Sequence, residues 1–269
     1  MTSQLPSQVQ PPNPPRSVDI LGMRVHDVTF AEAVALLRWQ IASGRAGMVV
    51  TPNTEFAMRA RCDLEFRQLL GSAGLAIPDG IGLVWASRLL GDPIREHVRG
   101  TDLVDKLAAL GAAEGYRFFL LGAAEGVAAA AAARLQERHP GLRIAGTHSG
   151  SPQPAYDDEA AAVIRAAGRV DVLLVAYGAP AQERWIARNQ PRLGVPVAIG
   201  VGGVFDFFSG RARRAPPWVR RLELEWLYRL VRQPSRWRRQ LALPRFAVCV
   251  VGIWLRRVLV DRVVRRGRS

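Results

Sequence analysis

Apolar runs alternate with helix-like segments over residues 18–210. Continuous apolar runs, each bounded by glycine or polar residues, occur at 46–51, 75–78, 116–122, 170–178 and 197–203. Such runs are typical of strands that are buried on both faces of a parallel sheet. The segments between them, for example 127–139 and 157–168, have the composition and length of helices. This alternation predicts an α/β domain in which a parallel sheet lies between two layers of helices.

The two ends of the chain depart from this pattern. Residues 1–17 are rich in proline, glutamine and serine and lack both apolar periodicity and the apolar core of a signal peptide, so we expect a disordered leader. A helix over 218–232 would place charged residues on one face beside an apolar stripe. Residues 246–255 add ten apolar residues, about half of what a membrane-spanning helix needs. The pattern predicts a basic, amphipathic, helical appendage over 211–269, with packing on the body as the alternative role of its helix.

Charge divides the chain at the same place. Residues 211–269 contain 17 arginines and three acidic residues, a net charge of +14 that equals the net charge of the whole chain. A neutral body with a cationic appendage indicates an anionic partner, either nucleic acid, phospholipid or a phosphorylated substrate. Cys62 and Cys249 are the only cysteines, which predicts neither a disulfide framework nor a zinc site and fits a reducing cytoplasm.

Candidate chemistry gathers where the predicted strands end. In open α/β sheets, ligands bind beyond the carboxyl ends of the strands. Here those ends bear glycine with small or polar residues, at 51–53, 78–80, 120–126, 176–183 and 200–206. One such segment indicates only a strand-to-helix turn, but five on one sheet edge favour a nucleotide or sugar-phosphate site. Neither a G-x-G-x-x-G after the first strand nor a P-loop, H-E-x-x-H or D-x-D motif occurs, so we expect no cofactor and no metal in the reaction.

Several longer strings resemble one family. They include TPNTEF, IPDGIGLVWASRLLG, REHVRGTDLV and LVAYGAPAQERWIA, together with the segments at 119–150 and 198–239. In this order, over residues 18–240, they resemble the WecG/TagA/CpsF family of bacterial glycosyltransferases. The resemblance implies a Rossmann-like parallel-sheet core with helices on both faces, and a C-terminal appendage that binds the membrane and completes the site.

The same resemblance implies an activity. Its members transfer a sugar from a UDP-sugar to an undecaprenyl-diphosphate-linked saccharide, with inversion, in cell-surface polysaccharide synthesis. The sugar is N-acetylmannosamine, its uronic acid or a glucose-type sugar, and no motif in this chain selects among them. The implied partners are the UDP-sugar donor, the polyprenyl-diphosphate-linked acceptor and an anionic membrane surface, at the cytoplasmic face of the bacterial plasma membrane. Whether the chain forms homo-oligomers is left open.

The resemblance also assigns roles to residues. Asp79, in the Pro-Asp-Gly segment, matches the catalytic aspartate, which acts as the base that takes a proton from the acceptor hydroxyl. Its alternative role is to cap the helix expected over 80–90. Thr51 and Asn53 are expected to offer a hydroxyl and an amide to the sugars, and their alternative role is also helix capping.

Arginines are expected to meet the charge of the leaving diphosphate. Arg99 is the candidate in the core, with a solvated surface arginine as the alternative. Arg214 and Arg221 are the candidates in the appendage, among Arg211, Arg213 and Arg220.

A further group resembles the nucleotide-binding edge of the family, with Asp206 holding the ribose or uracil: Gln182, Glu183, Gly202, Gly203 and Asp206. The alternatives are an ion pair of Glu183 with Arg184 or Arg188 and a turn capped by Asp206.

Two other function classes compete with this interpretation. Arginine and tryptophan also suit nucleic acid, but the apolar run at 246–255 has no use in such a binder, so we expect no nucleic-acid partner. A non-catalytic protein that binds sugar nucleotides would share every core motif, and only measured turnover separates it from an enzyme.

Overall fold

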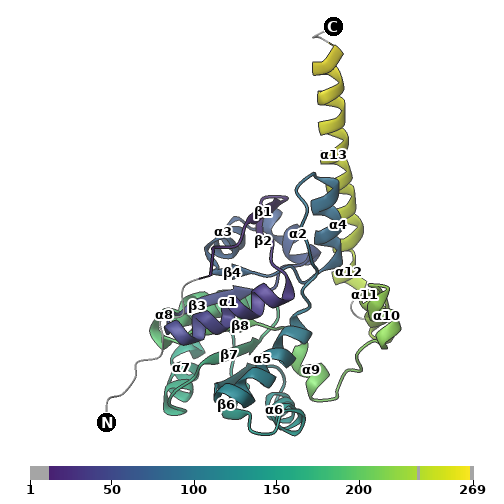
Figure 1. Ribbon diagram of the computed structural model, residues 1–269. Coiled ribbons are helices and arrows are strands. Elements are labelled where there is room, and N and C mark those ends of the chain that lie inside the picture. Colours follow the sequence, from purple (N-terminus) through teal and green to yellow (C-terminus); the bar gives the residue numbers. More distant parts are fainter. Residues whose placement is uncertain (1–11, 235–236, 267–269) are drawn as a thin grey trace.

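The computed structural model describes residues 12–234 and 237–266. Its centre is a six-stranded parallel sheet with the order β4-β3-β8-β7-β5-β6 (Figure 1). The strands are β3 (Gly47–Val50), β4 (Leu75–Ala76), β5 (Arg117–Gly122), β6 (Arg143–His148), β7 (Val172–Ala176) and β8 (Val197–Gly200). The expected α/β class is confirmed, and each of the five apolar runs contains a strand. The apolar pattern does not predict β6, because this edge strand is only partly buried.

Helices cover both faces of the sheet. Along β3, Met48 and Val50 belong to one apolar cluster and Val49 to the other, as the alternation of side chains in a strand requires. The first cluster is covered by α2 (Thr54–Cys62), α3 (Leu64–Ser72), α4 (Ile81–Leu89), α7 (Asp157–Ala166, preceded by the 3-10 turn Pro154–Tyr156) and α8 (Ala181–Leu193). The second is covered by α1 (Phe30–Ser43), α5 (Gly100–Glu114), α6 (Val127–Arg138) and α9 (Val204–Phe208). The predicted layers of helices are therefore confirmed.

Side-chain caps begin α1, α2 and α3, the last through Asp63. Thr29 and Glu32 form the expected capping box of α1, in which each side chain accepts a hydrogen bond from the other residue's backbone NH. Asn53 caps α2, since its Oδ1 accepts from the backbone NH of Glu55 at 2.9 Å and of Phe56 at 3.2 Å. The Asn53 cap places the start of α2 directly after β3, at the sheet edge where a ligand is expected.

A small antiparallel hairpin, β1 (Ser17–Ile20) and β2 (Met23–His26), precedes the core. Alternate residues, among them Val18 and Val25, are buried in the first apolar cluster, and Gly22 turns the chain with φ +82°. The expectation of a disordered leader over 1–17 is wrong at its end, because Ser17 pairs with His26. Residues 1–11 lie outside the described residues.

The appendage consists of α10 (Pro217–Arg221), α11 (Glu225–Arg232), α12 (Trp237–Gln240) and α13 (Ala242–Arg266). A single helix over 218–232, as the pattern predicts, is not formed, because Leu222, Glu223 and Leu224 separate α10 from α11. Glu223 adopts a left-handed backbone with φ +58° and directs its carboxylate to the core. The break therefore exchanges continuous helical hydrogen bonding for a contact between appendage and core.

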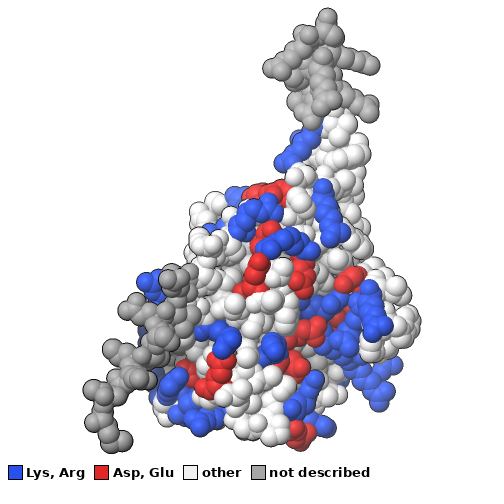
Figure 2. Space-filling view, in the orientation of Figure 1, with Lys and Arg blue, Asp and Glu red and all other residues white. Residues whose placement is uncertain are grey.

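Helix α13 leaves the body and extends away from it (Figure 1). Its first half packs on α2 and α4, where Phe246 and Val250 join the first apolar cluster. Its outward side chains include Val248, which is 72% exposed, and Leu259, which is 59% exposed. In the described part of the chain, no helix combines the length and apolar character needed to cross a membrane. Arginines gather instead beside α10 and α11, while much of the visible length of α13 carries no charge (Figure 2).

Candidate active site

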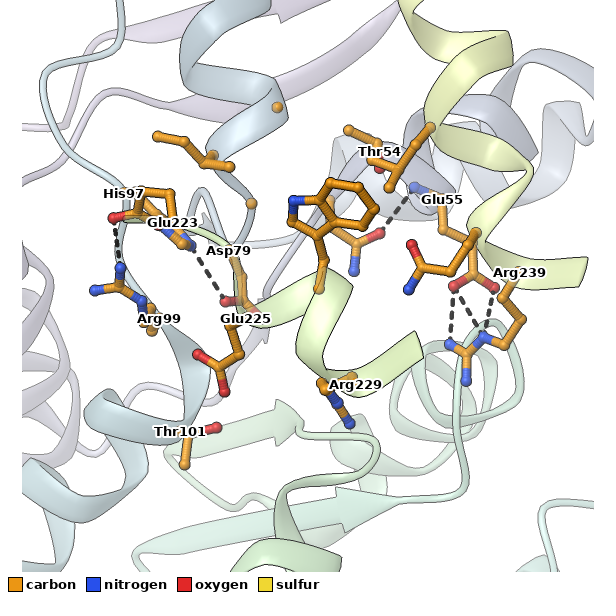
Figure 3. Close-up of a pocket in the computed structure, with 17 residues that line it drawn as sticks. Thr54, Glu55, Asp79, His97, Arg99, Thr101, Glu223, Glu225, Arg229 and Arg239 are labelled. Atoms are coloured by element: carbon orange, nitrogen blue, oxygen red, sulfur yellow. Dashed lines mark hydrogen bonds and ion pairs between the residues drawn. The ribbon is translucent and has the colours of Figure 1, made fainter. Parts of the chain in front are cut away.

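A cavity of about 230 Å³ lies where the core meets the appendage (Figure 3). From the core, the start of α2, the β4–α4 connection and the loop before α5 line it. From the appendage come the α10–α11 connection, α11, α12 and the start of α13. The lining residues are Asn53, Thr54, Glu55, Asp79, Gly80, Ile81, Gly82, His97, Arg99, Thr101, Glu223, Glu225, Trp226, Arg229, Arg239, Gln240 and Leu243. Neither part of the molecule encloses this space alone.

Asp79 presents a carboxylate in the cavity wall. Its backbone NH donates to Pro52 O at 3.0 Å, which ties the loop after β4 to the loop after β3. Its Oδ1 accepts a 3.1 Å hydrogen bond from the NH of Gly100, the first residue of α5. A Cβ on Gly100 would lie 3.3 Å from Asp79 Oδ2, so glycine leaves room for the carboxylate. The helix N-terminus stabilises the negative charge while the side chain stays 33% exposed to the cavity.

Beside Asp79, a network of charged groups joins core and appendage. His97 Nδ1 lies 2.9 Å from Glu223 Oε2, and His97 Nε2 lies 3.9 Å from Asp79 Oδ1. Burial lowers the pKa of His97, but the attraction of Asp79 and Glu223 outweighs burial, so that the pKa lies above its ordinary value. Arg99 forms an ion pair with Glu223 and donates to Arg220 O at 2.9 Å. The carboxylate of Glu223 therefore occupies the guanidinium and imidazole groups nearest to Asp79.

Two further arginines reach the cavity from the appendage. Arg229 lies 4.6 Å from the ring centroid of Phe207 and, among the described residues, forms no ion pair (Figure 3). Burial lowers the pKa of Arg229, although a guanidinium remains charged at neutral pH. Arg239 holds Glu55 through two nitrogens, with Nε at 3.0 Å and Nη2 at 2.8 Å from Oε2. The cavity thus gathers strong cationic groups around an open carboxylate.

Two of the three predicted catalytic residues line the cavity, and the third does not. Asp79 and Asn53 line the cavity. Asn53 also caps α2, which was its alternative role. Thr51 is buried behind the cavity wall, where its Oγ1 donates to Gly200 O at 3.3 Å and links the ends of β3 and β8. Its hydroxyl therefore supports the sheet edge.

The predicted nucleotide-binding residues form a second group along the same edge. Gln182 Oε1 accepts from Gly178 NH at 3.0 Å and from Gly202 NH at 2.9 Å, so it clamps the loops after β7 and β8 together. Gln182 Nε2 donates to Glu183 Oε1 at 2.7 Å. Gly203 starts α9 as its N-cap, and Asp206 lies within that helix. None of these residues lines the cavity.

Glu183 is fully buried, and burial raises the pKa of its carboxyl to about 7. The alternative that it pairs with neighbouring arginines is wrong, since Arg184 pairs with Asp63 and Arg188 with Asp157, each at 2.8 Å. The alternative role of Asp206 was to cap the following turn. In the structure its backbone carbonyl, and not its side chain, accepts the hydrogen bond of that turn, from Ala212 NH at 2.8 Å.

The appendage arginines are arranged differently from the sequence expectation. Arg214 is bound to Asp102 at 2.5 Å, and Arg221 is exposed, and neither lines the cavity. Arg229 and Arg239 lie there instead, together with Glu223, which sequence reasoning did not single out. A signal was present: Glu223 and Glu225 are two of only three acidic residues after Gly210. Isolated acids in so basic a segment indicate specific partners.

Over most of its length the chain is similar to known proteins. Residues 18–259 match the model of the Glycosyl transferase WecG/TagA/CpsF family. The N-acetylglucosaminyldiphosphoundecaprenol N-acetyl-beta-D-mannosaminyltransferase of Bacillus spizizenii is 37% identical over 207 residues, 77% of this chain and 79% of that protein. Proteins of the same name from Bacillus subtilis and Staphylococcus aureus are 36% and 30% identical, over 76% and 85% of this chain and 78% and 90% of theirs.

Proposed function

The chain belongs to the Glycosyl transferase WecG/TagA/CpsF family, and we propose that it transfers N-acetylmannosamine from a UDP-sugar to N-acetylglucosaminyl-diphosphoundecaprenol. The names of the relatives supply this acceptor and this sugar. The uronic acid of N-acetylmannosamine and a glucose-type sugar are the alternative donor sugars. The observation that carries the proposal is the open carboxylate of Asp79 in a cavity that it shares with Arg99, Arg229 and Arg239.

Asp79 acts as the general base in this proposal. Its Oδ1 is held by Gly100 NH, which leaves Oδ2 to take the proton from the acceptor hydroxyl. The hydroxyl oxygen forms a bond to the anomeric carbon of the donor sugar on the face opposite UDP. The bond from that carbon to the diphosphate oxygen breaks at the same time, so the configuration inverts and UDP leaves with the electron pair.

Arginines meet the negative charge that develops on the departing diphosphate. Arg229 is the strongest candidate, because its partly buried side chain lines the cavity without a carboxylate partner in the described chain. Arg99 and Arg239 become available once substrate phosphates displace Glu223 and Glu55. Gln182, Gly202, Gly203 and Asp206 hold the nucleotide at the neighbouring edge, with Gln182 fixing the loops that contact it.

We also propose that the protein acts at the cytoplasmic face of the plasma membrane. Exposed apolar residues of α13, among them Trp254, Leu255 and Leu259, suit the bilayer interface, and Arg256 and Arg257 suit anionic headgroups. A flotation experiment with anionic vesicles, repeated at rising salt, tests this. Binding of DNA in preference to such vesicles would favour the nucleic-acid alternative instead.

The decisive experiment supplies a lipid-diphosphate-GlcNAc analogue with a panel of UDP-sugars and identifies the product by mass. We expect one added N-acetylhexosamine from UDP-N-acetylmannosamine, and turnover that persists in EDTA because arginines offset the diphosphate charge. Restoration by Mg²⁺ or Mn²⁺ of activity lost in EDTA would overturn the metal-free mechanism. Donor binding without any turnover across the panel would leave a non-catalytic sugar-nucleotide-binding protein.

A further inference from the structure

An apolar groove of about 690 Å³ runs beside the cavity, between α4 and the appendage. Trp85 and Leu89 of α4 form one wall, and Leu230 of α11 and Val251 of α13 contribute to the other. Trp237 of α12 is 53% exposed at its border, and Trp85 is 57% exposed. Large exposed aromatic groups that line one concave surface indicate a ligand-binding surface.

The groove borders the polar cavity. The two spaces share lining residues from the core and from the appendage: Thr54, Ile81, Gly82, Trp226, Gln240 and Leu243. On one side of this shared border lie Asp79, Arg99 and Arg229, and on the other side the lining is almost wholly apolar. A ligand that spans both spaces must change from anionic to hydrocarbon within a short distance.

We propose that this groove binds the first isoprene units of the acceptor's polyprenyl chain, an inference that rests on the function proposed above. In such an acceptor the diphosphate is bonded directly to the hydrocarbon chain, so its charged and apolar parts meet where the cavity meets the groove. Helix α13 forms part of the groove and extends away from the body. The polyprenyl chain therefore has an apolar path from the reacting sugar toward the outer part of α13, where Trp254 and Leu255 are exposed.

Occupation of the groove fixes the acceptor relative to Asp79. Hydrocarbon contacts on one side of the diphosphate restrain its position, so the acceptor hydroxyl is delivered to the base in one orientation. The groove also makes the enzyme select a prenylated acceptor over a free sugar diphosphate, because only the former gains from burying apolar surface. We expect this selection to operate without any membrane.

The test compares two soluble acceptors, GlcNAc-diphosphate esterified either with farnesol or with methanol, in the absence of vesicles and below the concentration at which the farnesyl compound aggregates. We expect kcat/KM of the full-length protein to be at least tenfold higher for the farnesyl compound. In Trp85→Ala this ratio falls about tenfold, the equivalent of about 1.4 kcal/mol, because a groove wall is lost. Leu89→Gln, which alters the same wall, lowers the ratio in the same direction.

Trp218→Ala is the matched control, since Trp218 is 63% exposed on α10 and lies outside the groove. It keeps the wild-type ratio. Equal kcat/KM for both acceptors in the wild type overturns the groove assignment while leaving the proposed function intact. If the protein turns over neither acceptor, the result contradicts the proposed function instead of the groove assignment. Circular dichroism and the melting temperature verify that the variants are folded.

Photolabelling locates the farnesyl chain of the bound acceptor directly. A farnesyl acceptor with a benzophenone at its terminal isoprene unit is irradiated with the protein, and the labelled peptides are identified by mass spectrometry. We expect labels on α4 or on residues 241–251, lost when unlabelled farnesyl acceptor is added. Labels confined to residues 252–259 overturn the proposal in favour of general adhesion to apolar surface. A groove variant that changes the sedimentation coefficient but not the acceptor ratio assigns the groove to a second copy of this chain.

Discussion

The interactions that stabilise the core differ from those that attach the appendage to it. In the core, ion pairs such as Arg188–Asp157 and the Gln182 clamp connect elements that are already joined by two large apolar clusters. In the appendage, α11 and α12 contain no fully buried residue. Ion pairs with the core, among them Arg214–Asp102 and Arg239–Glu55, connect this part of the appendage, whereas α13 is attached by the buried Phe246 and Val250. The comparison teaches that burial builds the scaffold, whereas the charges of the site are shared across a weaker contact.

The weaker contact has a purpose in the proposed chemistry. An ion pair with an exposed partner contributes only about 0–1 kcal/mol and is screened by salt. Arg239, half exposed in its pair with Glu55, is of this kind. Substrate phosphates can therefore displace the carboxylates without unfolding the core, while Phe246 and Val250 keep α13 attached.

The largest expected effect removes the base that the core supplies. Asp79→Asn should lower kcat by about 100- to 10,000-fold, because an amide cannot take the hydroxyl proton. Binding of the UDP-sugar, measured by calorimetry, should be retained, since the nucleotide edge lies elsewhere. Near-normal turnover of this variant would show that Asp79 is not the base, and the core would then not supply it through this residue.

The next effect tests whether the appendage contributes to the reaction or only covers the site. Arg229→Ala should lower kcat by about 100-fold, the usual loss when one group that stabilises developing negative charge is removed. Single-turnover kinetics on a soluble acceptor measures the chemical step. Arg232→Ala, an exposed residue one turn along α11, is the control and should retain activity. Equal activities of the two variants would exclude Arg229 from the chemical step.

Buried charge in the core should affect stability more than any charge in the appendage. Glu183 has a pKa of about 7 in the folded protein, above its ordinary value of 4.5. Between these values the folded state binds more protons than the unfolded state, so stability falls as the pH rises. We expect Glu183→Gln to avoid a loss of about 3 kcal/mol that the wild type suffers between pH 5 and pH 8.

Denaturant unfolding at both pH values measures that difference. Glu137→Gln, an exposed position on α6, should unfold with the same pH dependence as the wild type. The Glu183 prediction fails if the free energy of unfolding changes with pH equally in the wild type and in Glu183→Gln. The folded protein would then hold the charged Glu183 carboxylate without a loss of stability.

The smallest effect concerns the contact between the two regions. Asp79 and Glu223 together raise the pKa of His97 in the folded protein, so the contacts of His97 with these two carboxylates stabilise the fold fully below the ordinary histidine pKa and are lost as the pH rises through the raised value. His97→Gln should therefore destabilise by about 1 kcal/mol at pH 6, one hydrogen bond's worth, and by less at pH 9. Melting temperatures measured across this range show the trend. A loss that grows with pH would contradict it.

Much of the core was predictable because burial leaves a local trace. The apolar runs at 116–122 and 170–178 contain β5 and β7, and the capping box at Thr29 starts α1. The edge strand β6 left no such trace, since its side chains are only partly buried. Asp79 was assigned from the resemblance and Arg99 from the need to meet the diphosphate charge, and both lie in the cavity. Arg214 and Arg221 were the candidates in the appendage, whereas Arg229 and Arg239 line the cavity, because the sequence does not report how the break at Glu223 directs the following segments onto the core.

By itself the sequence determined the α/β class, the family and the division into a neutral body and a cationic appendage, since these depend on local apolar patterns, shared motifs and summed charge. Only the tertiary structure decided which charges meet. Glu223 reaches His97 and Arg99 across more than 120 positions of sequence because its left-handed backbone turns the chain back onto the core. The apolar groove beside Asp79 arises in the same way, when α4 and α13 come together, and no periodicity in either helix encodes the space between them.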